Sequence, residues 1–164
     1  MTEQLDNSIL QQAEQKIEAS LTPETRGNYM KIVVAGMKVA MQGGPQSILA
    51  SLQKSKDPIG DCVKGAIGLC IMMSKHSRGK MPPKAMVPAA MTLMLHALDF
   101  ADKSGFVKVG TPELVKATKL FGDTIFKTAG ISKTMLQTAA GKVHGITQDP
   151  AQLAKVKQVA GGAA

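Results

Sequence analysis

The chain is nearly without aromatic residues. Its 164 residues include no Trp, one Tyr and four Phe, but 11 Met and 16 Gly. A core of this composition cannot rest on stacked rings, so it must bring backbones close over small side chains and fill the gaps with flexible methionine. This favours closely packed helices. It also suits repeated helix contact between subunits, with a monomeric bundle as the alternative.

Cysteine is scarce as well. Cys62 and Cys70 are the two cysteines, and on one helix their spacing corresponds to roughly 12 Å of rise, too far for a disulfide bond. We therefore predict that both are buried as small hydrophobic residues. The lack of a disulfide framework fits a reducing cytosol.

Long hydrophobic runs are also missing. No stretch reaches the roughly 18 uninterrupted apolar residues of a simple membrane span. The first 15 residues are polar and acidic, unlike a signal peptide. The sequence therefore predicts neither a simple span nor a secretion signal.

Acidic residues are absent between Asp61 and Asp99. Within this range two apolar segments, 65–73 and 85–98, flank a cationic connector, 75–84. The pattern predicts a helical hairpin with a positively charged tip, which suits lipid headgroups or nucleic-acid phosphates. The residues predicted to contact a membrane or nucleic acid are Lys64, Lys75, Arg78, Lys80 and Lys84.

An ordinary solvated loop is the alternative for this tip. The tip has no interleaved aromatic residues on which bases could stack, which argues against sequence-specific reading of nucleic acid. The two apolar arms are rich in small residues that let helices associate in lipid, but they are short and have no aromatic belt.

The net charge of +8 is unevenly distributed. Residues 1–30 hold five acidic and two basic residues, whereas residues 31–164 hold 18 basic and seven acidic ones. We therefore divide the chain into an acidic N-terminal helical arm (1–22), a basic helical body (23–159) and a disordered tail (160–164). The arm is suited to the basic surface of a neighbouring subunit.

Helix starts are marked by a polar residue followed by proline. The polar side chain accepts a first-turn N–H, and proline lacks the donor that would go unpaired. The four pairs are Thr22-Pro23, Asp57-Pro58, Thr111-Pro112 and Asp149-Pro150. With apolar periodicity, they predict helices over residues 6–21, 23–41, 45–54, 58–75, 83–103, 112–129, 132–144 and 150–159. The predicted fold is all-α, a closely packed oligomeric bundle of about six to eight helices with a central helical hairpin.

Two features of these helices bear on packing. The helix over residues 23–41 is apolar nearly all round, which predicts that it is mostly buried. Glycines in the first arm of the hairpin cost roughly 1 kcal/mol each relative to alanine, so they indicate that another backbone comes close. The residues predicted at helix-packing or oligomer contacts are Gly60, Gly65, Gly68, Met72, Met91 and Met94.

No pattern in the chain indicates a reaction. His76, His96 and His144 lack a second His or Cys at metal-ligand spacing. Gly79-Lys80 lacks the earlier glycine and the following Ser or Thr of a phosphate loop. We therefore expect a non-enzymatic protein without catalytic residues, cofactor or metal ligands.

Two segments carry a resemblance to a known class of protein. They are KIVVAGMKVAM at residues 31–41 and DPIGDCVKGAIG at residues 57–68. Across residues 25–110 the chain resembles small virion proteins of short-tailed bacteriophages that carry a giant virion RNA polymerase. The resemblance implies a protein that is packaged in the capsid, ejected with the genome and assembled into a conduit across the host envelope. It supplies no catalytic residues.

The function expected from these observations is structural. Copies of the chain would form a ring or tube around passing double-stranded DNA, with lysines facing the lumen or the host membrane, and with other virion or ejection proteins as partners. The protein would reside in the virion and, after ejection, in the host envelope. A basic bundle that binds nucleic acid or a partner protein without an envelope role is the alternative. A third is a structural domain whose charge serves only solubility.

Overall fold

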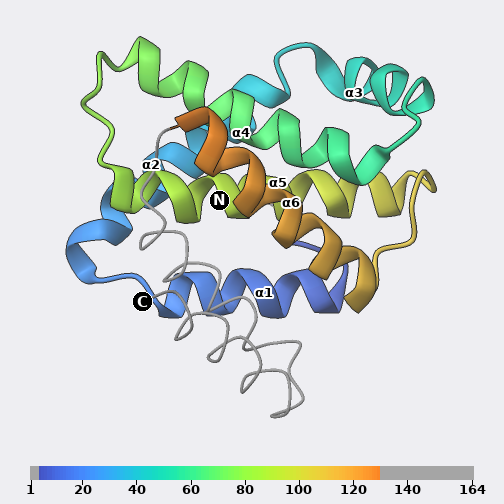
Figure 1. Ribbon diagram of the computed structural model, residues 1–164, viewed down its shortest axis with the longest axis horizontal. Coiled ribbons are helices and arrows are strands. Elements are labelled where there is room, and N and C mark those ends of the chain that lie inside the picture. The colour runs from blue at the N-terminus through green and yellow to red at the C-terminus, as the bar shows by residue number, and fades with distance from the viewer. Residues whose placement is uncertain (1–3, 130–164) are drawn as a thin grey trace.

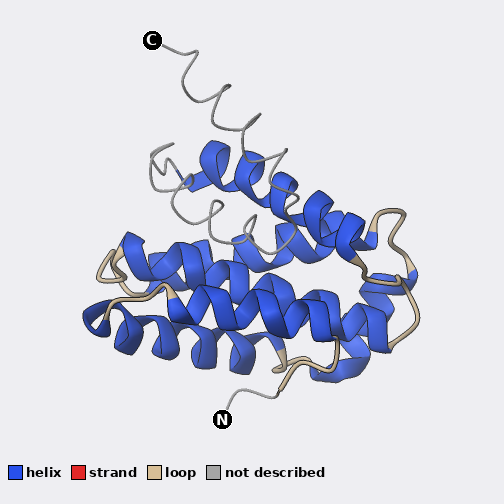
Figure 2. Ribbon diagram, turned by 90° about the horizontal axis from the view of Figure 1, so that it is seen from below, coloured by secondary structure: helices blue, strands red, loops and turns tan. Residues whose placement is uncertain are grey.

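The computed structural model describes residues 4–129 of the chain. These residues form six α-helices and no strand (Figures 1 and 2). The helices are α1 (Ser8–Ala19), α2 (Pro23–Ala40), α3 (Gly44–Gln53), α4 (Pro58–His76), α5 (Pro83–Lys103) and α6 (Thr111–Ala129). The all-α prediction is confirmed. The helices expected over 132–144 and 150–159, and the tail 160–164, lie outside the described residues.

Helix α5 is the centre of the bundle. Helices α1, α2 and α4 all pack on it, and α6 packs on α4. Figure 1 shows α5 between α1 and α4, with α6 crossing in front. Fourteen of the 21 residues of α5 are buried, as expected for a helix that is apolar on every side. The α4–α5 hairpin therefore supplies the core against which the other helices dock.

The N-terminal segment shares this core. Leu5, Leu10, Ala13 and Ile17 are all buried and form the apolar stripe by which α1 lies along α5. Residues that the charge pattern groups into an acidic arm are thus packed within their own chain.

The predicted caps are realised unevenly. Thr22 accepts the N–H of Thr25 at 3.3 Å and caps α2 as expected. Asp57 makes no capping bond to α4 and instead pairs with Lys116 of α6 at 3.1 Å. The prediction for Thr111 is wrong, because Thr111 is already helical; the α6 start is closed by the Glu113 carboxylate, which accepts the Gly110 N–H at 2.9 Å.

Helix α2 differs from the expectation that it is mostly buried. Tyr29, Ile32, Val33 and Gly36 are buried, but an apolar strip on the same helix faces outward. Its exposed large side chains are Met30, Val34 and Met41. The reason is that α2 packs against other helices on one side only, on α5 and part of α4. The sequence shows that α2 is apolar, but it does not show how many helices pack against it.

Helix α3 stands apart from the rest of the bundle, at the upper right of Figure 1. Leu52 is its one buried residue. It begins at Gly44, whose φ of 74° lies in the left-handed region that glycine adopts without strain. The helix therefore bridges α2 and α4 while adding little to the core.

Candidate polyanion-binding surface

The turn between α4 and α5 closes α4 with a Schellman motif. The Gly79 N–H donates to the Ser74 carbonyl at 3.1 Å, and the Arg78 N–H donates to the Lys75 carbonyl at 3.1 Å. This pair of bonds requires a left-handed residue just after the helix. Arg78 takes that role with φ of 54°, and it is the one non-glycine residue with positive φ among residues 4–129. The turn is therefore ordered by backbone bonds and by the Ser77 hydroxyl, which donates to the Ser74 carbonyl at 2.8 Å, and the Arg78 side chain takes no part in it.

Four cations surround this turn. Lys75, Arg78, Lys80 and Lys84 are all exposed, and none forms an ion pair with another described residue. Three lysines of the α5–α6 region, Lys103, Lys108 and Lys116, instead each lie within 3.5 Å of a carboxylate. The contrast follows from the acid-free sequence on both sides of the turn. The result is a local excess of positive charge, at the left edge of Figure 1.

The start of α5 adds to this positive end. Pro82 is its N-cap and offers no side-chain bond, and the first turn of α5 contains no acidic residue. The first N–H groups of a helix point outward and carry the positive end of the helix dipole. Lys75 and His76, in the last turn of α4, complement the opposite dipole end of that helix.

One face of α4 extends the surface. Lys64 lies 11 residues before Lys75, so the two are about 20° apart around the helix and roughly 16 Å apart along it. Gly68 and Met72 lie between them and are exposed. Lys64 and Lys75 thus share one face of α4, and the other three predicted contact cations follow in the turn and at the start of α5. We call this set of exposed cations at the tip and along α4, comprising Lys64, Lys75, Arg78, Lys80 and Lys84, the cationic edge.

The predicted helix-packing residues separate into two groups. Met91 and Met94 are buried in the core, with 2% and 0% of their surface exposed, and Gly60 is buried near the Asp57 carboxylate. Gly65 and Gly68 are exposed, and a Cβ placed on either would meet nothing within 4 Å. The expected close approach of another backbone is therefore absent at these two glycines in the described chain.

The close approach occurs elsewhere, at Gly36 of α2. A Cβ there would lie 2.6 Å from Cδ1 of Leu93 and 3.2 Å from Cε of Met73. Gly36 therefore lets α2 lie against α4 and α5. The available sequence signal was a glycine inside the apolar stretch 32–37 of this helix.

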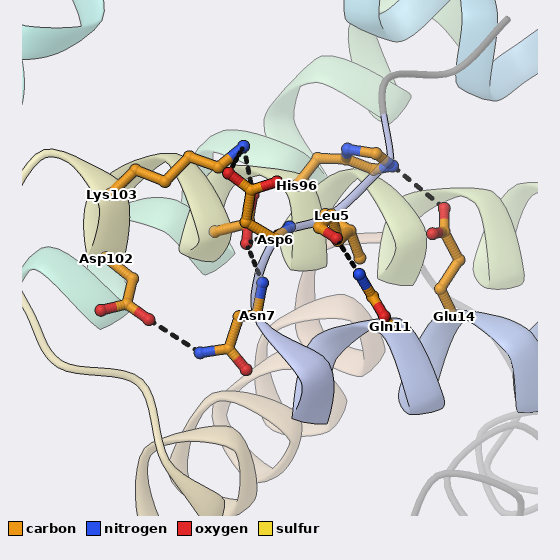
Figure 3. Close-up of polar contacts among 9 residues, drawn as sticks. Leu5, Asp6, Asn7, Gln11, Glu14, His96, Asp102 and Lys103 are labelled. Atoms are coloured by element: carbon orange, nitrogen blue, oxygen red, sulfur yellow. Dashed lines mark hydrogen bonds and ion pairs between the residues drawn. The ribbon is translucent and has the colours of Figure 1, made fainter.

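A polar cluster at the opposite end of α5 was not predicted (Figure 3). Asn7 donates from Nδ2 to the Asp102 carboxylate at 2.7 Å and to the Val109 carbonyl at 2.9 Å, while its Oδ1 accepts the Ile9 N–H at 3.0 Å. The Asp99 carboxylate accepts the Asn7 N–H at 2.9 Å. An Asn directly before an apolar stripe is a sequence signal for the start of a helix. No sequence signal, however, links Asn7 to its distant partners Asp99, Asp102 and Val109.

Lys103 joins this cluster from α5. Its Nζ lies 3.0 Å from carboxylate oxygens of both Asp6 and Asp99. These bonds raise the pKa of Lys103 above its ordinary value, with the Asp99 hydrogen bond as the larger cause. The cluster holds the start of α1 against the end of α5. The carboxylates of Asp6, Asp99 and Asp102 are bound to groups within the cluster.

Both cysteines are buried. Burial raises the thiol pKa of Cys62 to about 11 and that of Cys70 to about 12, so both stay protonated and behave as the buried hydrophobic residues that were predicted. Within residues 4–129, no three His, Cys, Asp or Glu side chains gather as metal ligands. No helix in this same range is both long and apolar enough to cross a bilayer.

Comparison of the chain with protein-family models, curated proteins and solved structures gives no match.

Proposed function

We propose that this protein is a non-enzymatic structural protein that binds the phosphate backbone of double-stranded DNA through the cationic edge. The supporting observation is Arg78, which places a guanidinium at the left-handed position of a helix end where glycine would fit without strain. Arg78 is strained, and its side chain has no ion-pair partner among the described residues. This combination favours a role for the side chain in binding rather than in stability.

The chemistry of the cationic edge fits a sequence-independent contact. Each lysine or arginine that neutralises a phosphate releases a condensed counterion, so affinity depends steeply on salt. The edge has no aromatic side chain on which a base could stack. Many weak, salt-screened contacts of this kind suit a polymer that slides past the protein.

The same proposal includes assembly. In the virion role implied by the phage resemblance, copies surround the passing DNA with their cationic edges inward, first in the capsid and then in the host envelope. The outward apolar strip of α2 (Met30, Val34 and Met41) and the open glycine face of α4 (Gly65 and Gly68) are the surfaces available for contact between copies or with other virion proteins.

A salt-titrated DNA shift assay tests the DNA contact. The test variant changes Lys75, Arg78, Lys80 and Lys84 to Glu, and the matched control changes Lys31, Lys38, Lys54 and Lys56 to Glu, which are also exposed and without a described partner. Both variants change the net charge equally. In the test variant alone, we expect the slope of log Kobs against log salt to fall by about 0.9 for each phosphate that the edge no longer neutralises. Equal weakening of DNA binding in both variants would refute a contact at this edge.

A basic DNA-binding bundle without an envelope role is the second candidate, and it shares the same edge. Native mass measurement separates the two, because only the conduit requires a closed homo-oligomer. Flotation with anionic liposomes tests the host-membrane contact: wild-type protein that floats while the four-Glu edge variant does not supports it, and unaltered flotation removes it.

A further inference from the structure

An apolar pocket lies among α2, α3, α4 and α5, and none of the five cations of the cationic edge lines it. Its volume is about 420 Å³, within the range of small-molecule sites in proteins. Most of the lining is aliphatic or aromatic, and only three of its residues, Ser51, Asp61 and His96, bring a polar side-chain group. Pockets of this composition bury most of a small ligand and orient it by a few polar atoms.

His96 supplies the buried polar atom. The residue is 8% exposed and lines the pocket from α5. Its Nε2 lies 3.0 Å from Oε1 of Glu14 (Figure 3), so the carboxylate holds the ring proton on Nε2. In the neutral ring Nδ1 then carries the lone pair, and it has no hydrogen-bond partner among residues 4–129. A buried acceptor without a donor costs free energy, which a ligand hydroxyl at this place would remove.

The pocket has an accessible side between α3 and α4. Helix α3 covers it with Ile48, Ser51 and Leu52, of which Leu52 alone is buried. On α4, Gly65 lines the pocket with open space where a side chain would be. A ligand can therefore reach the pocket beside Gly65, where no side chain fills the space.

We propose that this pocket binds a neutral aliphatic alcohol, with its chain between α2 and α4 and its hydroxyl donating to Nδ1 of His96. A volume of about 420 Å³ equals that of roughly a dozen water molecules at roughly 30 Å³ each, which is room for a short aliphatic chain. The acids near the pocket, Asp61 on its wall and Glu14 behind His96, disfavour a carboxylate head group. The pocket is a site separate from the DNA contact proposed above.

Titration with 1-octanol, followed by NMR of methionine methyl groups, tests the proposal. Met37 and Met41 line the pocket, whereas Met86 is buried elsewhere in α5. We expect saturable shifts of the Met37 and Met41 methyl signals with the Met86 signal unmoved. Octanoate and 1-methoxyheptane, which match the probe in heavy-atom chain but not in head group, are expected to bind about tenfold more weakly.

Two variants on the same helix face give the control. Gly65→Leu fills the mouth of the pocket, and Gly68→Leu places the same side chain in open space outside it. We expect Gly65→Leu to abolish the saturable shifts and Gly68→Leu to retain them. Ala40→Leu, on the exposed α2 wall, provides a second blocking variant if Gly65→Leu folds poorly.

Three outcomes would overturn the proposal. One is the absence of saturable shifts with 1-octanol, and another is equal binding by the ether. The third is a shift of Met37 and Met41 that follows protein concentration rather than octanol, since that result would assign the pocket to contact with a second copy of the chain.

Discussion

Arg78 and Gly105 occupy the same position in two helix-ending motifs. At the end of α5 the Phe106 N–H donates to the Ala101 carbonyl at 3.0 Å and Gly105 has φ of 77°; at the end of α4 the matching bond joins Gly79 to Ser74, and Arg78 has φ of 54°. For a residue with a Cβ, the left-handed conformation costs roughly 1–2 kcal/mol. The end of α5 thus has an unstrained glycine at this position, whereas the end of α4 has a charged and strained arginine.

Replacing Arg78 by Gly should therefore separate stability from binding. We expect Arg78→Gly to raise the free energy of unfolding by about 1 kcal/mol, because the Cβ strain is removed, while DNA affinity falls. Urea denaturation and the shift assay measure the two effects. Lys80→Gly is the control: it removes a charge from the same turn at a position without positive φ, so it should weaken DNA binding without a gain in stability. A less stable Arg78→Gly protein would contradict the argument.

The polar cluster around Asn7 should contribute strongly to the stability of the fold. We expect Asn7→Ala to lower the free energy of unfolding by about 2–3 kcal/mol, since it removes a helix cap together with the bonds to Asp102 and Val109. Asn28→Ala, at an exposed position of α2, should change it by less than about 0.5 kcal/mol. Chemical denaturation of both variants checks this, and similar values would show that the cluster adds nothing.

Tyr29 gives a pH-dependent signature. Its hydroxyl lies 2.9 Å from Oγ1 of Thr92 in the core, and burial raises its pKa from 10.0 to about 12. Between these values the folded state binds a proton that the unfolded state has released, so stability must fall as pH rises from 10 to 12. We expect this fall to be shallower in Tyr29→Phe.

The comparison isolates the tyrosine because the other buried groups are shared. Cys62 and Cys70 also titrate at high pH, but they are present in both proteins. Near neutral pH, Tyr29→Phe should be less stable by about 1 kcal/mol through loss of the Thr92 hydrogen bond. Identical pH profiles for the two proteins would contradict a buried, protonated Tyr29.

The open glycine face of α4 leads to a stabilising substitution. We expect Gly68→Ala to raise the free energy of unfolding by about 0.5–1 kcal/mol, because alanine favours the helix and its Cβ would meet nothing within 4 Å. Gly105→Ala should instead destabilise, since its backbone is left-handed. Thermal unfolding of the two variants measures both signs, and a destabilised Gly68→Ala protein would indicate a contact at that face.

Helix positions were largely readable from the sequence. The helix predicted over residues 83–103 is the α5 observed at Pro83–Lys103, and the other five begin and end within about two residues of their predicted limits. Proline and glycine mark these ends by local chemistry, which a sequence displays directly. The antiparallel hairpin followed because its two apolar arms are separated by a short connector.

Tertiary partners were not readable. The bonds of Asn7 to Asp99 and Asp102 join residues 92 and 95 apart in the chain, and no local pattern links such residues. The burial of α2 was overestimated for the same reason, because apolarity does not say how many neighbours a helix has. The cations of the tip were identified from the lack of nearby acids, but the left-handed conformation of Arg78 depends on backbone geometry.

The central position of α5 has a consequence for synthesis. Helices α1, α2 and α4 all precede α5 in the chain and all pack on it. During translation, α1, α2 and α4 are therefore synthesised before α5, the helix that covers their apolar faces. Until Lys103 has cleared the ribosome the growing polypeptide has no finished interior, so the bundle cannot complete its core before α5 has been made.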